Sequence, residues 1–275
     1  KLYEIAATKY DFAQDISYSQ EVSNELLLIT NSKEEYEEFI SKVNVNDFEL
    51  FSINENIIKD IKGHIGNLQV TVLDEDEDIT LNVSQIVWFD AKQPRKERIG
   101  IFDPNLSTID EVIQTLKNNI NSYSYKKFTT YDSSICQYHE RREEICSKCE
   151  EVCPTVAITK DDKTKTLTFS QIDCHGCGGC ISVCPSGAVD YAPSNKEALF
   201  EMSKFYKNTH PLVIPAKMNL ENLEVSLKEN ILPFAIEGEK FLHEASFLTL
   251  LQMSGSQVIF YSDFLSKGSK DAIRI

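Results

Sequence analysis

Short apolar runs alternate with polar stretches along the first ninety residues, and turn-forming or capping residues separate them. Leu26–Thr30 has the length and composition of a buried strand, and Asn31 or Ser32 can cap a helix from Lys33 to about Val43. Further strands are predicted over Phe48–Ile53, Leu68–Leu73 and Ile79–Phe89, with a short helix over Glu55–Ile61. No element is predicted over residues 1–24. The alternation of strands and helices indicates an α/β layer.

The same analysis predicts elements on both sides of a cysteine-rich segment. Ser107 or Thr108 can cap a helix from Ile109 to about Ile120, and its apolar face is expected to pack under that segment. The last eighty residues alternate again between helices and strands, as in an α/β module with parallel strands. The helices are predicted over Lys196–Tyr206, Asn219–Lys228 and Lys240–Met253, and the strands over Pro211–Pro215, Leu232–Ile236 and Val258–Tyr261.

All eight cysteines lie in one segment and form two similar runs. The second run has the pattern C-x2-C-x2-C-x3-C-P and consists of Cys174, Cys177, Cys180, Cys184 and Pro185. The first run has nine residues in its first gap and consists of Cys136, Cys146, Cys149, Cys153 and Pro154. The two runs are an internal repeat, because Cys149–Thr159 aligns with Cys180–Asp190. Between them, Val156–Thr159 and Thr166–Phe169 predict a β-hairpin, and Val189–Tyr191 predicts a closing strand.

In these residues, from about 131 to 193, the chain resembles the dicluster bacterial ferredoxins, which carry two [4Fe-4S] clusters. The resemblance implies that the fourth cysteine of each run begins a helix and binds the cluster of the other run. One cluster would take Cys136, Cys146, Cys149 and Cys184, and the other would take Cys174, Cys177, Cys180 and Cys153. Pro154 and Pro185 suit the first turn of those helices. Gly176, Gly178 and Gly179 would let backbone amides donate to sulfur.

Other uses of the cysteines were weighed against this interpretation. Paired C-x2-C motifs also form structural zinc sites, but a zinc site has no use for a third cysteine two residues later. A disulfide framework fits poorly, because the chain is long and acidic. The stretched gap after Cys136 leaves a second possibility: a three-cysteine site that loses an iron or takes another ligand, with Asp132 and His139 as the nearby candidates.

The composition of the chain restricts the kinds of molecule that it can bind. The 275 residues carry a formal net charge of −15, which speaks against nucleic acid and anionic membrane surfaces. Such a surface suits docking to a basic patch on a redox partner protein, although solubility alone would also explain it. No stretch is long and apolar enough for membrane insertion, and none is typical of a signal peptide. Thiolate ligands favour a cytoplasmic location. The sequence begins at Lys1 without Met, so a fragment with a missing targeting segment is also allowed.

The sequence thus predicts an α+β protein in which a ferredoxin-like 2[4Fe-4S] domain is flanked by N-terminal and C-terminal α/β modules. The three regions would span residues 1–130, 131–193 and 194–275. The predicted function is electron transfer as a component of a larger oxidoreductase system, weakly resembling ferredoxin-domain accessory proteins of formate dehydrogenase or heterodisulfide-reductase-type systems. Two alternatives are a catalytic flavin- or nucleotide-dependent subunit and a structural or sensory iron–sulfur protein. Phosphate-binding glycine motifs are absent, and His64, His210 and His243 are expected to be ordinary turn, packing or surface residues.

Overall fold

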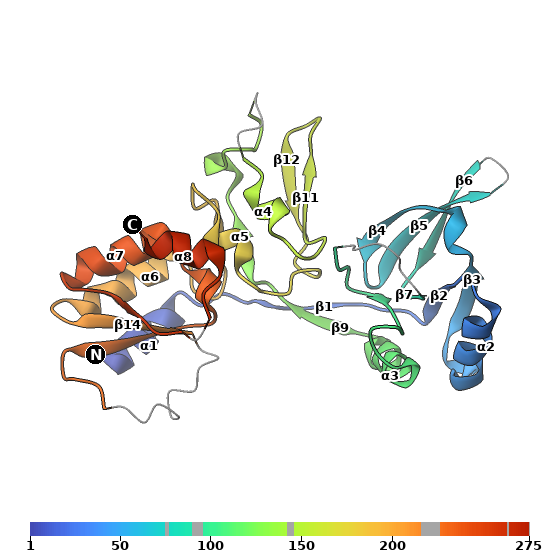
Figure 1. The fold of residues 1–275 in the computed structure, drawn as a ribbon, viewed down its shortest axis with the longest axis horizontal. Helices are drawn as coiled ribbons and strands as arrows, with labels where there is room; N and C mark the ends of the chain where they lie inside the picture. The colour runs from blue at the N-terminus through green and yellow to red at the C-terminus, as the bar shows by residue number, and fades with distance from the viewer. Residues whose placement is uncertain (75–76, 90–95, 142–145, 216–225, 263, 275) are drawn as a thin grey trace. The chain divides into compact units, whose positions relative to one another are not determined.

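The computed structural model describes residues 1–74, 77–89, 96–141, 146–215, 226–262 and 264–274, and its fold is α+β (Figure 1). The chain divides into two compact units. Unit 1 consists of Lys1–Ile16, Lys127–Cys153 and Ala157–Ile275, and unit 2 consists of Ser17–Lys126 and Pro154–Val156. The residue boundaries of the three regions expected from the sequence stay a prediction.

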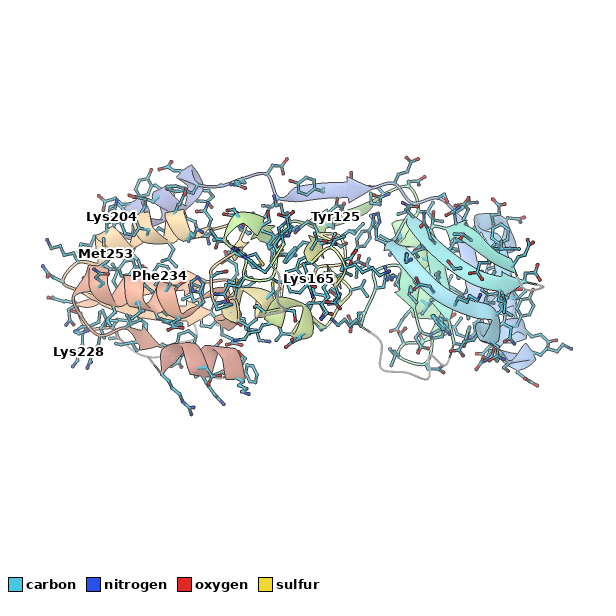
Figure 2. The ribbon with its side chains drawn as sticks, turned by 90° about the horizontal axis from the view of Figure 1, so that it is seen from above. Tyr125, Lys165, Lys204, Lys228, Phe234 and Met253 are labelled. Carbon is cyan, nitrogen blue, oxygen red and sulfur yellow. The ribbon has the colours of Figure 1, made fainter. Side chains whose placement is uncertain are left out.

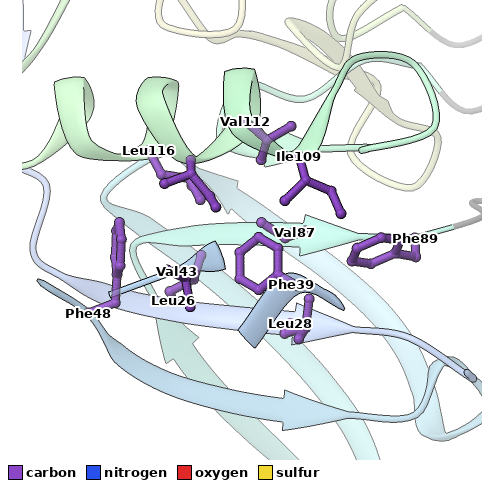
Figure 3. Packing of buried hydrophobic residues seen from close by; sticks show 11 residues of the cluster. Leu26, Leu28, Phe39, Val43, Phe48, Val87, Phe89, Ile109, Val112 and Leu116 are labelled. Carbon is purple, nitrogen blue, oxygen red and sulfur yellow. The ribbon is translucent and has the colours of Figure 1, made fainter. Parts of the chain in front are cut away.

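Unit 2 is built on a parallel sheet with the strand order β3 (Glu49–Ile53), β2 (Glu25–Ile29), β7 (Gln85–Trp88) and β8 (Ile101–Phe102). The α/β layer expected from the sequence is therefore present, and its strands are parallel. Helices α2 (Lys33–Lys42) and α3 (Ile109–Asn119) share one apolar core with this sheet, as Figure 3 shows. Ile109, Val112 and Leu116 of α3 belong to that core. The expectation that α3 packs under the cysteine segment is wrong, because its apolar face is already covered by β2 and α2.

An antiparallel sheet of β4 (Ile58–His64), β5 (Asn67–Asp74) and β6 (Glu77–Val83) shares a second core with the parallel sheet. The predicted helix over Glu55–Ile61 is wrong, since only a 3-10 turn, Glu55–Ile57, precedes β4. Ile58 and Ile61 have helical spacing, but a register shift between Ile58 and Asp60 lets both pack against the same core. The predicted strand Ile79–Phe89 is two strands, β6 and β7, separated at Ser84.

The first twenty residues are more regular than expected. Helix α1 (Leu2–Asp11) belongs to unit 1, where Ile5 and Phe12 pack against a core and Lys9 pairs with Glu237 at 2.7 Å. In unit 2, β1 (Ser17–Gln20) pairs antiparallel with β9 (Tyr123–Lys126), and the ring of Tyr18 stacks 5.7 Å from that of Tyr125. Both elements depend on partners from distant parts of the sequence, so the local pattern does not predict them.

The cysteine segment forms two antiparallel strand pairs in unit 1. Strand β10 (Thr129–Tyr131) pairs with β13 (Val189–Tyr191), and β11 (Ile158–Asp161) pairs with β12 (Thr166–Phe169). The predicted hairpin and closing strand are therefore confirmed. The short helices α4 (Lys148–Glu151) and α5 (Gly179–Ser182) precede the Cys-Pro pairs. The expectation that helices begin at Cys153 and Cys184 is wrong, because the chain turns after each cysteine. The carbonyl of Pro154 accepts the N–H of Glu97 at 3.0 Å, and Gly187 has a left-handed backbone with φ +65°.

The C-terminal part of unit 1 is a parallel sheet with the strand order β15 (Ile231–Ile236), β14 (His210–Pro215) and β16 (Ile259–Phe260). Its core contains Phe234, which Figure 2 labels, together with residues of α1, α6 (Lys196–Ser203) and α7 (Glu244–Ser254). The parallel strands were predicted, whereas α8 (Lys267–Ile273) was not.

Two helices predicted near this sheet are not confirmed with their predicted bounds. Helix α7 begins at Glu244 rather than Lys240, because the side chain of His243 accepts a hydrogen bond from the backbone N–H of Ala245 at 3.2 Å and caps the helix. Most of the predicted helix Asn219–Lys228 lies outside the described residues, and residues 226–228 are not helical. Among the described helices, none has the length and apolar character needed to cross a membrane.

Candidate metal centre

The eight cysteines gather into two groups of four within unit 1. The thiol of Cys149 has Cys184, Cys146 and Cys136 as near neighbours. The thiol of Cys180 has Cys174, Cys177 and Cys153 near it, and Cys149 as well. We call these the first cysteine group (Cys136, Cys146, Cys149 and Cys184) and the second cysteine group (Cys153, Cys174, Cys177 and Cys180). Each group combines three cysteines of one run with the last cysteine of the other.

Both groups are largely enclosed by protein. Cys136, Cys149 and Cys180 are less than one-tenth exposed and belong to a core with Ile158, Ile181 and other apolar residues, whereas Cys177 is exposed. Burial and the neighbouring thiols raise the pKa of Cys149 to about 12, and they raise the pKa of Cys180 as well. Such thiols ionise only when a cation takes the place of the proton, so metal binding here releases protons. None of the eight cysteines forms a disulfide.

Backbone amides donate to the first sulfur of each run in the same way. The N–H of Tyr138 donates to Cys136 Sγ at 3.4 Å, and the N–H of Gly176 donates to Cys174 Sγ at 3.4 Å. Gly176 has φ +65° and Gly178 has φ +75°, a left-handed conformation that a side chain rarely adopts. A Cβ on Gly176 would lie 2.7 Å from the ring of Phe128. The N–H···S hydrogen bond predicted for Gly176 is therefore present, and Tyr138 makes the equivalent bond in the first run.

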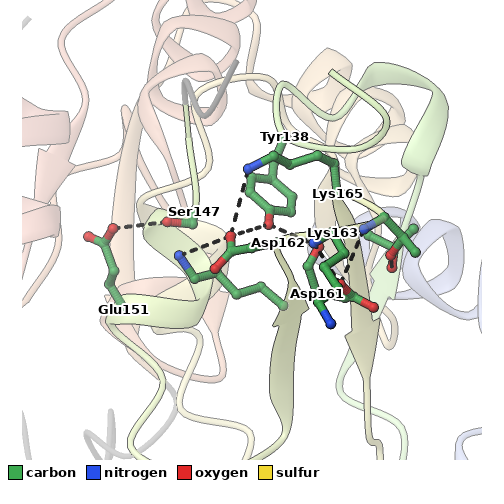
Figure 4. Close-up of polar contacts among 10 residues, drawn as sticks. Tyr138, Ser147, Glu151, Asp161, Asp162, Lys163 and Lys165 are labelled. Carbon is green, nitrogen blue, oxygen red and sulfur yellow. Dashed lines mark hydrogen bonds and ion pairs between the residues drawn. The ribbon is translucent and has the colours of Figure 1, made fainter. Parts of the chain in front are cut away.

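The long gap after Cys136 is fixed to the β11–β12 hairpin by Tyr138 (Figure 4). This side chain is fully buried, and its hydroxyl donates to Asp162 Oδ1 at 2.8 Å and to the carbonyl oxygen of Asp161 at 3.3 Å. The hydroxyl lowers the pKa of Asp162, and the ammonium groups of Lys160 and Lys165 contribute to the same effect. The backbone N–H of Glu140 also donates to the carbonyl of Lys165, at 2.9 Å. The described part of the insertion, residues 137–141, therefore lies against the hairpin, and Cys136 is buried.

The two alternative ligands lie in different surroundings. Asp132 is exposed, and its carboxylate accepts hydrogen bonds from the backbone N–H and the hydroxyl of Ser134 at 2.9 and 2.6 Å, which lower its pKa. His139 is partly buried, and its ring centroid lies 6.3 Å from that of Tyr131. The carboxylate of Asp132 is thus occupied as the cap of a 3-10 turn, Ser133–Ile135.

A loop of the C-terminal sheet covers part of the second cysteine group. A Cβ added to Gly178 would lie 3.0 Å from the backbone of Lys240 and 3.1 Å from the ring of Phe241. The ring of Phe241 lies 4.2 Å from that of Tyr191 and packs against the cysteine core. Phe241 lies outside the cysteine segment, and no signal in the sequence connects it with the cysteines.

The donor set fits an iron–sulfur cluster. Within the described residues, no three Cys, His, Asp or Glu side chains converge closely enough to hold a single metal ion. The thiolates of a [4Fe-4S] cubane bind four different irons and therefore surround a larger volume than the ligands of one ion do. Four cysteines per group, most of them buried or partly buried and one in each group accepting a backbone N–H···S hydrogen bond, are the ligand chemistry that such a cluster needs.

Comparisons with known proteins agree with this chemistry. Residues 144–188 match the 4Fe-4S dicluster domain. An uncharacterized ferredoxin of Methanocaldococcus jannaschii is 34% identical over 64 residues, which are 23% of this chain and 94% of the relative. The chain belongs to the ferredoxin family. Its ferredoxin domain holds two [4Fe-4S] clusters and transfers electrons. The dicluster match begins after Cys136, so the first cysteine lies outside it.

Two residues next to the clusters were not singled out in the sequence as parts of the site. Tyr138 is an aromatic residue in the middle of a polar insertion, which is a sign of an anchored rather than a free loop. Phe169 could have been found from the internal repeat, because it occupies the position that Tyr131 has in the first run. The three histidines discussed above have backbone partners: besides His243, the Nδ1 atoms of His64 and His210 lie 3.0 and 3.2 Å from carbonyl oxygens.

Proposed function

We propose that this ferredoxin is an electron-transfer component of a larger oxidoreductase system and that all eight cysteines are cluster ligands. Cys136, Cys146, Cys149 and Cys184 bind the first cluster, and Cys153, Cys174, Cys177 and Cys180 bind the second. The observation that carries this proposal is the gathering of the cysteines into two interleaved groups of four. When bound, the clusters supply reversible one-electron transfer. The chain supplies thiolates, amide donors and an enclosure that keeps water away.

Cys136 is included although it precedes the dicluster match. Its sulfur accepts the N–H of Tyr138, its side chain is 7% exposed, and Cys149 has it as a neighbour. Arg141 Nε also donates to the carbonyl oxygen of Cys136 at 3.3 Å, which adds a second contact between the insertion and the first cysteine. These contacts hold the thiol beside the other three of its group despite the nine-residue gap.

The position of the cysteines also suggests where a partner approaches. Cys149 of the first group is a neighbour of Cys180 of the second, so the two groups adjoin inside the domain. Cys177 is the exposed cysteine of the second group. Electron transfer becomes slower with distance, so the partner protein docks near Cys177 rather than near the first group, whose cysteines are buried or partly buried.

The partner carries a basic docking patch. The net charge of −15 gives this chain an acidic surface, and long-range attraction to a basic surface speeds association. The relative from Methanocaldococcus jannaschii matches 23% of the chain, so most of the chain, including the sheet of unit 2, lies beyond a minimal ferredoxin. These additional regions bind the other components of the oxidoreductase system. A reducing, cytoplasmic environment would preserve the thiolates and the clusters.

The cluster assignment is tested by metal and sulfide analysis of anaerobically prepared protein, with EPR of the dithionite-reduced sample. We expect two clusters that are reduced reversibly and whose EPR signals interact. A zinc protein, a single cluster, or clusters that cannot be reduced reversibly would refute electron transfer through both groups. The visible spectrum of the same sample separates the catalytic alternative, since a bound flavin adds its own bands to the iron–sulfur absorption.

The partner is tested by capture of the full chain, with its clusters, from an anaerobic lysate of its own organism. We expect a redox enzyme to be retained in fixed stoichiometry at low salt and to be released as salt screens the acidic surface. A chain that exchanges electrons with added acceptors but retains no redox enzyme under any salt condition would be a freely diffusing carrier.

A further inference from the structure

Tyr131 and Phe169 occupy equivalent positions in the internal repeat. Each lies five positions before the first cysteine of its run, Tyr131 before Cys136 and Phe169 before Cys174. Each is the last residue of a strand, β10 and β12 respectively. Their rings stack on one another with centroids 4.5 Å apart and an angle of 28° between the planes. The two halves of the cluster domain therefore meet at a pair of rings that differ by one hydroxyl group.

That hydroxyl is buried and lies beside a cysteine. Among the described residues, Tyr131 Oη has no hydrogen-bond partner, sulfur atoms included. The side chain of Cys136 lies near it, and Tyr131 packs against the core that contains this cysteine. Burial raises the pKa of Tyr131, and the nearby Cys136, Cys149 and Cys184 raise it further, so the hydroxyl keeps its proton at neutral pH. A buried O–H without a partner is unfavourable, which indicates an acceptor that forms only when a nearby thiol binds metal and loses its proton.

His139 is the other polar side chain near this hydroxyl. Its Nδ1 atom is also buried, and neither it nor Tyr131 Oη has a hydrogen-bond partner in the described part of the chain. The two atoms therefore do not bond to each other, although the rings are neighbours. The neighbouring side chain that can become an acceptor on metal binding is therefore Cys136.

We propose that the Tyr131 hydroxyl donates an O–H···S hydrogen bond to the Cys136 thiolate of the first cluster, and that the absence of this hydroxyl at Phe169 leaves the second cluster without its equivalent. This inference rests on the proposed ligand assignment. Reduction adds negative charge to a cluster and its sulfurs, so a hydrogen-bond donor stabilises the reduced state more than the oxidised state. Tyr131 is thus a positioning residue that makes the first cluster easier to reduce than the second.

The test is a redox titration, followed by EPR, of the anaerobic holoprotein and its Tyr131→Phe variant. Phenylalanine keeps the ring stack and removes only the hydroxyl. We expect the equilibrium constant for reducing the first cluster to fall roughly fivefold, as for loss of one hydrogen bond, while the second cluster is unchanged. A Cys177→Ala variant, which alters only the second group, identifies which potential belongs to which cluster. If neither potential moves, or if both move equally, the proposal is wrong.

The matched variant is Phe169→Tyr, which places a hydroxyl at the equivalent position of the second run. We expect it to raise the potential of the second cluster and leave the first unchanged. Phe169→Tyr also tests the proposal if Tyr131→Phe fails to retain iron. If the potential of the second cluster does not change in Phe169→Tyr, the proposal is wrong. If the unaltered protein lacks two reducible clusters, the proposed function has failed rather than this inference.

Discussion

The two halves of the cluster domain reach the same local geometry by different means. In each half, the residue two positions after the first cysteine donates its N–H to that cysteine's sulfur at 3.4 Å. In the second half this residue is Gly176, whose positive φ permits a tight turn. In the first half it is Tyr138, and the turn is replaced by an insertion whose aromatic residue is buried against the β11–β12 hairpin.

This difference shows that cysteine spacing alone does not define the site. A glycine allows the chain to form a tight turn, while a long insertion needs side-chain contacts to hold the first cysteine near its group. The second half therefore depends on the absence of a side chain, and the first half depends on the presence of one. The predictions below exploit this contrast.

The largest effect is expected from removing the first cysteine of each half. Cys136→Ala and Cys174→Ala should each convert or destroy one cluster and leave the other intact, because each removes one thiolate from a different group. Iron analysis and EPR of anaerobic samples measure the outcome, with the unaltered protein as control. Full iron content in Cys136→Ala would show that this cysteine is not a ligand and that the halves differ more than proposed.

A smaller effect is expected from Tyr138→Ala, which removes the anchor of the insertion. Loss of a large, fully buried aromatic side chain costs about 3–5 kcal/mol. We expect the first cluster to lose iron faster than the second when a chelator is added, as followed by visible absorption and EPR.

Tyr138→Phe is the matched control for this prediction, because it keeps the ring and removes only the hydrogen bonds to Asp162 and Asp161. It should cost about 1 kcal/mol and retain both clusters. If Tyr138→Ala loses iron equally from both clusters, the anchor does not act on the first half alone.

The smallest of these effects is expected in the second half, from Gly176→Ala. The left-handed backbone costs about 1–2 kcal/mol with a side chain, and the added Cβ would meet the Phe128 ring at 2.7 Å. Gly187→Ala is the control, because Gly187 has the same φ of +65° and open space around it. Thermal unfolding of the holoproteins should show a greater loss for Gly176→Ala. Equal losses of stability would mean that the Phe128 ring moves aside and that the left-handed backbone alone destabilises the variants.

Much of the cluster domain was predictable from the sequence, because its constraints are local. The repeat places the hairpin and the strand Val189–Tyr191, and glycine spacing predicts the amide of Gly176 at a sulfur. The elements that were missed depend on distant partners or on local irregularities. Helix α1 packs on the C-terminal core through Ile5 and Phe12, and the shift at Ile58 and Asp60 gives a strand the apolar spacing of a helix. Phe241 covers part of the second cysteine group through tertiary packing, which no local sequence pattern predicts.

The interleaving of the two runs is the central claim, and paired substitutions test it most directly. Cys149→Ala with Cys184→Ala removes two cysteines of the first group, although they come from different runs. Cys149→Ala with Cys153→Ala removes two cysteines of one run, although they come from different groups. EPR and iron analysis should find one intact [4Fe-4S] cluster in the first double variant and none in the second. The reverse result, with the intact cluster in the second double variant, would contradict the account.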